Sequence, residues 1–222
     1  MSKYTETLSR VSNDRKRPME LALSDWMDFL IDLWDLEHVR NGYEAWAQHV
    51  LQLQTENPEY LDLNQDWAAD VTRAMEKGTW LDLFGNLYEA LYLSRGKASS
   101  QGQFFTPQSV SDLMAQIATG KKENGLVADC AAGSGRLLLS HYMQVTHVDH
   151  GKRFGLFYEA TDNDPVACKM CALNMMMHGM HGKVICRNSL LMDTPSVIYH
   201  INEIRYPFPT MFYSIRREYP KE

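Results

Sequence analysis

The sequence lacks any apolar run near the roughly 18 residues that a membrane-spanning helix requires, so we expect no membrane span. Its polar first residues also lack an apolar signal core, and we therefore expect a cytoplasmic protein. Cysteine is scarce, and the four residues present stand beside apolar neighbours in the second half of the chain. They do not form the dense disulfide framework of a small secreted domain, so we expect them to be reduced.

Positive charge is also in short supply. The chain has 22 lysine and arginine residues against 28 aspartate and glutamate residues, a formal net charge of −6 at pH 7. Proteins that hold nucleic acid through their own electrostatic field usually have a basic balance. Any nucleic-acid role therefore needs a local basic patch or a partner, and the short basic clusters at residues 10–17 and 216–217 are more typical of solvated surface.

The chain does contain enough apolar material for a core. Hydrophobic residues make up 45% of its 222 residues and charged residues 23%, a balance typical of globular proteins. In residues 1–96, apolar side chains recur at helical spacing, as in Trp26, Phe29, Leu30 and Leu33, and glycine or proline separates these runs. We expect residues 1–96 to form a helical region.

After residue 96 the pattern changes to alternating strands and helices. Strand-like runs at residues 125–132, 154–162 and 183–189 alternate with helical runs, and residues 196–202 offer a fourth strand. A strand, a glycine turn, a helix and a strand in this order predict half of a doubly wound parallel sheet. We therefore expect an α/β fold with a second domain over residues 97–222.

The strongest signal for a binding site is Asp129-Cys130-Ala131-Ala132-Gly133-Ser134-Gly135, between a predicted strand and a predicted helix. Glycines let the backbone turn tightly and let a ligand approach, and a helix N-terminus offers N–H groups to it. Asp129 would repel a pyrophosphate and attract a cationic amino-acid ligand. Leu138 stands where a dinucleotide-binding fingerprint has its third glycine, which disfavours an NAD enzyme. A tight turn without a ligand stays open as an alternative.

An acidic residue ends the next predicted strand. Asp162, or Glu159, would accept the two hydroxyls of a ribose, as in nucleotide-binding sheets generally. Together with the glycine turn, this carboxylate predicts a cofactor that contains adenosine.

A third cluster has the residue types of a zinc site but a simpler interpretation. It consists of Cys168, Cys171, His178 and His181. The two cysteines fall on the apolar side of a predicted helix, so we expect core packing and no metal.

Four segments in this part of the chain together resemble the N6-adenine DNA methyltransferases, in particular the modification subunits of type I restriction systems. They are Gln103 to Pro107, Asp129 to Gly135, Asp162 to Gly179 and Asn188-Ser189-Leu190. They correspond to the family's amino-terminal motif and motifs I, II and III, and they follow the family's order. A segment like Leu-Phe-Gly-Asn-Leu-Tyr-Glu-Ala-Leu precedes them, as it does in those subunits.

The resemblance implies a Rossmann-like sheet that binds S-adenosylmethionine. The amino-terminal motif would close over the methionine moiety, Asp129 would meet its ammonium, and Asp162 would take the ribose. The implied cofactor-binding residues are Phe104, Phe105, Thr106, Pro107, Asp129, Ala131, Gly133, Ser134, Gly135, Asp162, Asn163, Asn188 and Ser189. The family usually has aspartate at Asn188 and cysteine at Ala132.

The family's catalytic motif is missing. The family uses Asn-Pro-Pro followed by tyrosine or phenylalanine, after the fourth strand, to polarise the adenine amine and stack the flipped base. No such tetrapeptide occurs here, and Asn202 is the one catalytic candidate at the expected place. Asn57-Pro58-Glu59-Tyr60 looks similar, but too few residues separate it from the cofactor motifs for a permuted fold, so we expect a helix-breaking loop there.

Two functions stay open. The first is an S-adenosylmethionine-dependent adenine-N6 DNA methyltransferase, or its cofactor-binding portion, that works in a restriction-modification system with a separate specificity or partner subunit. The second is a degenerate, inactive relative that acts as a binding or assembly component. The family's sheet has more strands than are predicted here, so we expect an incomplete sheet with an open strand edge. That edge would be covered by residues 196–202, by the aromatic C-terminal segment, by a second copy of the chain or by another protein.

Overall fold

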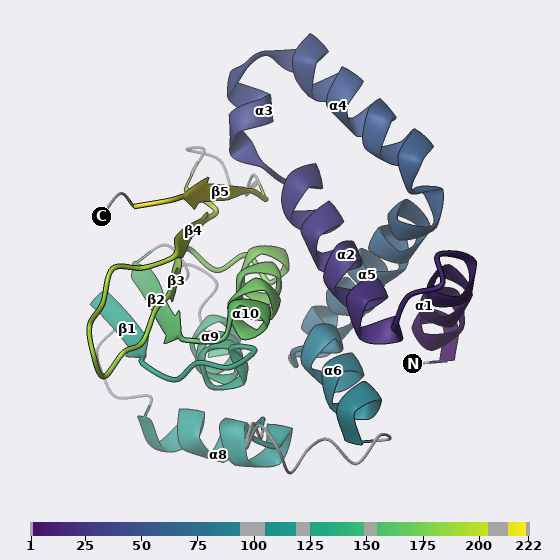
Figure 1. Ribbon diagram of the computed structural model, residues 1–222. Helices are drawn as coiled ribbons and strands as arrows, with labels where there is room; N and C mark the ends of the chain where they lie inside the picture. The colour runs from purple at the N-terminus through teal and green to yellow at the C-terminus, as the bar shows by residue number, and fades with distance from the viewer. Residues whose placement is uncertain (1, 94–104, 119–124, 149–154, 204–212, 221–222) are drawn as a thin grey trace.

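The computed structural model describes residues 2–93, 105–118, 125–148, 155–203 and 213–220 (Figure 1). The first of these ranges is almost entirely helical. Its helices are α1 (Ser2–Asp14), α2 (Met19–Leu33), α3 (Leu36–Arg40), α4 (Tyr43–Glu56), α5 (Pro58–Glu76) and α6 (Leu83–Leu93). The predicted helical region is confirmed, while the predicted boundary at residue 96 lies outside the described residues.

Aromatic side chains fill the core of this helical region. The Trp26 ring centroid lies 5.0 Å from that of Phe84 and 5.9 Å from that of Tyr4, and Trp67 also lies 5.0 Å from Phe84. All four side chains are buried, and contacts between large rings add to the gain from burial. Helix α6 is therefore anchored in the helical core through Phe84.

Residues 57–60 interrupt the helices less than expected. Helix α4 ends at Glu56, and Pro58 is the first residue of α5, a position that suits proline because it has no N–H to donate. The buried Tyr60 donates its hydroxyl to the carbonyl of Ala22 at 3.2 Å. The predicted loop is thus corrected to a short break followed by a helix start.

The described residues from 105 onward form a mixed sheet of five strands and three helices. In space as in the chain, the strand order is β1 (Gly125–Asp129), β2 (Leu156–Asp162), β3 (Gly182–Cys186), β4 (Val197–Ile201) and β5 (Ile215–Glu218). The helices are α8 (Gln108–Ala118), α9 (Arg136–Val148) and α10 (Pro165–Met177). Strands β1, β2 and β3 are parallel, and β4 and β5 are antiparallel to their neighbours. The predicted α/β class is confirmed.

Strand β4 does not lie where a fourth methyltransferase strand was expected. It pairs with β3, on the side of the sheet away from β1. Residues 187–196 join β3 to β4, and this connection is shorter than the dozen or so residues of a parallel crossover. The chain therefore turns back, and β4 runs antiparallel beside β3.

The outer edge of β1 is open among the described residues, since no described strand pairs with it. The Leu126 side chain on this strand is 63% exposed. Neither β4 nor the described part of the C-terminal segment covers this edge. The prediction of an incomplete sheet is confirmed.

Helix α10 lies between the sheet and the helical region (Figure 1). It contacts β2 and β3 on one side and α2 and α6 on the other, so nearly all its residues are buried. The run of methionines at 175–177 and both cysteines of this helix belong to the core. Among the described residues, no three His, Cys, Asp or Glu side chains lie close enough together to hold a metal ion. No helix in the described part of the chain is long and apolar enough to span a bilayer.

Strand β5 joins the sheet to the helical region at a second place. The Ile215 amide donates to the Trp34 carbonyl at 2.9 Å. The Arg217 guanidinium donates to the buried Asp35 carboxylate at 2.8 Å. The turn between α2 and α3 is thus held to the far edge of the sheet.

Candidate functional site

The glycine turn lies between β1 and α9, at the carboxyl ends of the parallel strands. Gly133 and Gly135 have φ angles of 55° and 90°, which residues with a side chain rarely adopt. The Ala132 amide donates to the Thr161 carbonyl of β2 at 3.1 Å, and Gly135 donates to Ala132 at 2.8 Å. A Cβ at position 135 would lie 2.9 Å from the sulfur of Cys171, so α10 also leaves no room for a side chain there.

Asp162, at the end of β2, holds the turn from the other side. Its Oδ2 accepts the Gly133 amide at 2.8 Å, and its Oδ1 accepts the Asp164 amide at 3.0 Å. Each carboxylate oxygen has two lone pairs, so both oxygens keep the capacity to accept a hydroxyl. The structure therefore brings together the turn and the acid that the sequence analysis placed in one site. Asn163, next to this acid, is exposed.

Asp129, at the end of β1, has one carboxylate oxygen without a hydrogen-bond partner within the described ranges of the chain. Its Oδ1 accepts the Ala131 amide at 3.1 Å, while Oδ2 is buried and has no hydrogen-bond partner among the described residues. A buried acceptor of this kind costs free energy unless a donor meets it. Asp129 Oδ2 is therefore suited to an N–H donor of a bound cation.

The amino-terminal motif meets the turn through Phe105. A Cβ added to Gly133 would lie 3.2 Å from the Phe105 ring, so the ring packs directly over the turn. The Tyr88 ring of α6 contacts the Phe105 ring edge-on, with 5.8 Å between the two ring centroids. Thr106 and Pro107 lead into α8, and the Pro107 carbonyl accepts the Ser111 amide at 3.0 Å. Phe104 lies outside the described residues.

A buried network that the sequence analysis missed lies behind the turn, and Asp82 is at its centre. The Asp82 carboxylate accepts hydrogen bonds from Ser134 Oγ at 2.5 Å, Arg136 Nε at 2.6 Å, and Asn174 Nδ2 and the Gly85 amide at 2.8 Å each. Asp82 is 1% exposed. It caps the first turn of α6 and at the same time binds the glycine turn and α10.

Arg136, the first residue of α9, extends this network. It donates to Asn86 Oδ1 at 2.9 Å, to Glu89 Oε2 at 3.0 Å and to the Thr106 carbonyl at 3.3 Å. Burial opposes its charge, but the attraction of Asp82 and the hydrogen bonds raise the pKa of Arg136 above its usual value. The signal that could have indicated the pair is an acid between Leu81 and Leu83 in an otherwise apolar stretch.

His178 joins the same region by a separate contact. Its Nδ1 donates to the Asn174 carbonyl at 2.7 Å, and its Nε2 accepts the Leu81 amide at 3.2 Å. Burial lowers the pKa of His178 to about 4. A neutral imidazole with its proton on Nδ1 satisfies both contacts.

Asn188 and Ser189 follow β3 and thus lie at the same end of the sheet as Asp162. The Asn188 amide oxygen accepts the amides of Leu190 at 3.0 Å and Leu191 at 3.2 Å, so it stabilises its own turn. Both residues are half-buried. The prediction that they contact an adenine ring is not tested by these contacts.

Asn202, the candidate catalytic residue, lies at the opposite end of the sheet. The preceding residue, Ile201, pairs with Gly182, the first residue of β3, because β4 is antiparallel. The Asn202 amide nitrogen donates to the carbonyls of Met176 at 3.1 Å and Met180 at 2.8 Å, and its oxygen accepts the Ser214 amide at 2.9 Å. This corrects the placement of Asn202 beside the cofactor motifs.

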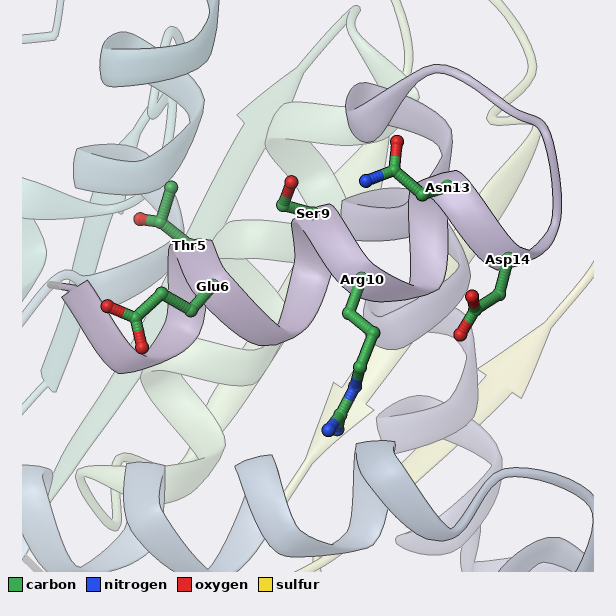
Figure 2. A pocket seen from close by; sticks show the side chains of 6 residues that line it. All are labelled: Thr5, Glu6, Ser9, Arg10, Asn13 and Asp14. Carbon is green, nitrogen blue, oxygen red and sulfur yellow. The ribbon is translucent and has the colours of Figure 1, made fainter.

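Two hollows in the surface differ in their relation to the site. One, of about 270 Å³, lies between α8, β1 and α9 and includes Asp129, Val127 and Leu138 in its lining. The other, of about 570 Å³, is lined by six side chains that all come from α1 (Figure 2). Residues from one helix do not converge on a ligand, so we regard the α1 hollow as open surface.

Comparison with known proteins adds three findings. A sequence model of the family described as N-6 DNA methylase matches residues 80–205. The chain is 38% identical over 104 residues to the type I restriction enzyme MpnII methylase subunit of Mycoplasma pneumoniae, and the match covers 45% of this chain and 18% of that protein. A crystal structure of a type I restriction-modification system methyltransferase subunit from Streptococcus thermophilus aligns with a TM-score of 0.37 at 22% identity, over 87% of this chain and 40% of that one.

Proposed function

The chain belongs to the N-6 DNA methylase family, and from this premise we propose that it binds S-adenosylmethionine as the cofactor-binding part of an adenine-N6 DNA methyltransferase. The observation that carries the proposal is the buried Oδ2 of Asp129, which has no hydrogen-bond partner in the described part of the chain and lies beside a glycine turn bonded to Asp162. A carboxylate at this place fits the ammonium of an amino-acid moiety, and a second one fits a ribose. The chain matches less than a fifth of the length of its curated relative, so the activity of a whole methylase is part of the proposal.

The residues of the site would each contact a different part of the cofactor. Asp129 Oδ2 accepts an ammonium N–H of the cofactor, and Asp162 accepts ribose hydroxyls with its remaining lone pairs. Phe105 and Thr106, with Phe104 and Pro107, cover the methionine end and exclude water from it. Asn163, Asn188 and Ser189 border the adenosine. When bound, S-adenosylmethionine supplies a methyl group on a positively charged sulfur.

The turn itself contributes backbone rather than side chains. Ala131, Gly133, Ser134 and Gly135 let the main chain pass close to a ligand, because Gly133 and Gly135 have no Cβ in the way. Ser134 is 1% exposed and bonded to Asp82, so its hydroxyl serves the turn and not the ligand.

We also propose that a second polypeptide completes the site, in a restriction-modification system with DNA as the substrate. The family's Asn-Pro-Pro-Tyr/Phe motif does not occur in the sequence, and Asn202, its candidate replacement, lies at the other end of the sheet from Asp129 and Asp162. The open edge of β1 ends at Asp129, so a strand added there would bring its own residues next to the site. A separate specificity subunit or a second copy of the chain would fill this place, in the cytoplasm.

A second candidate function is that of an inactive binding or assembly component. The observation that favours it is Asn202, whose amide is fully engaged with backbone groups at the other end of the sheet. In this case the cofactor site would persist without methyl transfer by this chain.

Calorimetric titration of the purified chain with S-adenosylmethionine, S-adenosylhomocysteine and NAD tests the proposal. We expect saturable binding of the first two and none of NAD, because Asp129 disfavours a pyrophosphate. Binding of NAD alone, or of none of the three, would overturn the cofactor assignment. Transfer of a labelled methyl group to DNA, with and without partner subunits, then separates the two candidate functions.

A further inference from the structure

The two glycines leave the turn with little conformational restraint of its own. Gly133 and Gly135 both have positive φ, and glycine reaches many other conformations at little cost. A turn with two such residues needs outside contacts to keep the single shape in which Gly133 points to Asp162. Ser134, between the two glycines, receives these contacts.

Ser134 is held by both its side chain and its backbone. Its hydroxyl donates to Asp82 at 2.5 Å, and its carbonyl accepts Asn174 Nδ2 at 2.9 Å. The same Asn174 nitrogen lies 2.8 Å from the other oxygen of Asp82. Asp82 and Asn174 therefore fix the residue between the glycines from two directions.

The fit around Asp82 is tight, which makes its position specific. A Cβ on Gly85 would overlap the Asp82 carboxylate, so only glycine at position 85 leaves room for it. The Gly85 amide, in the first turn of α6, donates to Asp82 at 2.8 Å. The start of α6 and the shape of the turn thus depend on one carboxylate.

Arg136 connects the same carboxylate to Phe105, the aromatic ring that covers the glycine turn and is called the aromatic cover below. It donates to Asp82 and to the Thr106 carbonyl, and its guanidinium carbon lies 5.2 Å from the centre of the Phe105 ring. Asn86 and Glu89 of α6 hold its outer nitrogens. The turn, the aromatic cover and helix α6 therefore meet at a single buried ion pair.

We propose that Asp82 and Arg136 are positioning residues that hold the glycine turn and Phe105 in the shape that binds the cofactor. The helical region would then set the affinity of a site to which it contributes no ligand-binding side chain. This inference rests on the proposed function for the identity of the ligand.

The test compares Asp82→Asn with Asp35→Asn. Both carboxylates are buried, both bind an arginine, and both join the helical region to the sheet, but Asp35 does so at β5. We expect Asp82→Asn to weaken the binding of S-adenosylhomocysteine at least tenfold in calorimetry, at a temperature where urea unfolding shows both variants folded. Asp35→Asn should bind S-adenosylhomocysteine with an affinity within twofold of that of the unchanged chain, even if it loses as much stability as Asp82→Asn does.

A measurement made without ligand distinguishes a positioning role of Asp82 from a general loss of stability. Hydrogen exchange of the peptide that spans residues 129–137, followed by mass spectrometry, reports the amides of the turn. We expect exchange about tenfold faster in Asp82→Asn and no change in Asp35→Asn. If Asp82→Asn does not fold, Ser134→Ala removes one bond to the same carboxylate without leaving a charge unpaired, and it should show the same pattern with a smaller change.

The outcomes distinguish this inference from the proposed function. If the unchanged chain binds S-adenosylhomocysteine and Asp82→Asn binds it equally well, the positioning role is wrong while the function stands. If the unchanged chain does not bind, the proposed function fails. Hydrogen exchange of the turn then decides the inference, and equal exchange in the two variants would overturn it.

Discussion

At the scale of single residues, the carboxylates at the ends of β1 and β2 differ in what they do without a ligand. Asp162 accepts two backbone amides and so contributes to the fold. Asp129 accepts one, and its second oxygen is buried without a hydrogen-bond partner among the residues that the structure describes. Asp162 therefore contributes to the stability of the fold, whereas the buried Oδ2 of Asp129 costs free energy of folding. Such a cost is expected at a polar atom that binds a ligand.

Alanine at either position should abolish cofactor binding without unfolding the chain. Asp162→Ala should also lower the free energy of unfolding by about 1–3 kcal/mol, because two partly buried amides lose their acceptor. Asp129→Ala should change stability less. Calorimetry and urea unfolding measure the two effects, with Asp28→Asn, an exposed carboxylate paired with Lys169, as the control. Unchanged affinity in both alanine variants would refute the site assignment.

The imidazole of His178 should make stability depend on pH. Its pKa is about 4 in the folded chain, against roughly 6.5 when unfolded. Between these values the unfolded chain binds a proton that the folded chain does not, so stability falls as pH drops from 6.5 toward 4. The loss attributable to His178 at pH 4.5 is about 2 kcal/mol.

His178→Gln should remove this part of the pH dependence. Urea unfolding at pH 7 and pH 4.5 should show a smaller loss of stability in the variant than in the unchanged chain. His141, whose pKa is also lowered by burial, remains in both proteins and cancels from the comparison. Equal losses in both proteins would show that His178 is not buried as a neutral group.

At the scale of elements, the contact of the glycine turn with α10 gives a prediction for Gly135→Ala. The φ of 90° and the 2.9 Å approach of a Cβ to the Cys171 sulfur should together cost about 1–3 kcal/mol. Cys171→Ala in the same chain removes the sulfur and should restore part of the loss, while the backbone strain remains. A double-mutant cycle by urea unfolding measures the coupling, and strictly additive effects would contradict this contact.

The sequence predicted those elements whose signals are local. The turn after β1, the acid at the end of β2 and the helical runs can each be predicted from a few neighbouring residues. The position of β4 does not, because it depends on the length of the connection from β3 and on which strand edge is free. Asn202 was misplaced for that reason.

Asp82 shows a second limit of prediction from the sequence. Its four donors come from α6, the glycine turn, α9 and α10, so no local pattern contains the network. An acid within an apolar run indicates a buried polar contact but does not identify its partners.

At the scale of the whole molecule, the open edge of β1 is the place where we expect a second polypeptide. Exposed apolar side chains of α8 and β1 accompany it, namely Val110, Leu113, Met114, Ile117 and Leu126. An unpaired strand edge with apolar surroundings favours association.

Leu126→Lys should therefore reduce association without loss of stability. The side chain is 63% exposed, so the free energy of unfolding should change by less than about 0.5 kcal/mol. Light scattering at micromolar concentration should give a mass above 25.6 kDa for the unchanged chain and a lower mass for the variant. A monodisperse monomer in both cases would contradict self-association at this edge.

The attachment of β5 to the turn between α2 and α3 has a consequence for the order of folding. Arg217 and Asp35 are 182 positions apart in the chain, and closing a loop of that length costs conformational entropy before any contact repays it. Contacts such as those of α1 with α2 and of α4 with α5 join residues much closer in the chain, so these helices should pack together earlier. We expect the docking of β5 to be a late kinetic step, so that during synthesis the turn between α2 and α3 stays accessible to chaperones until β5 has left the ribosome.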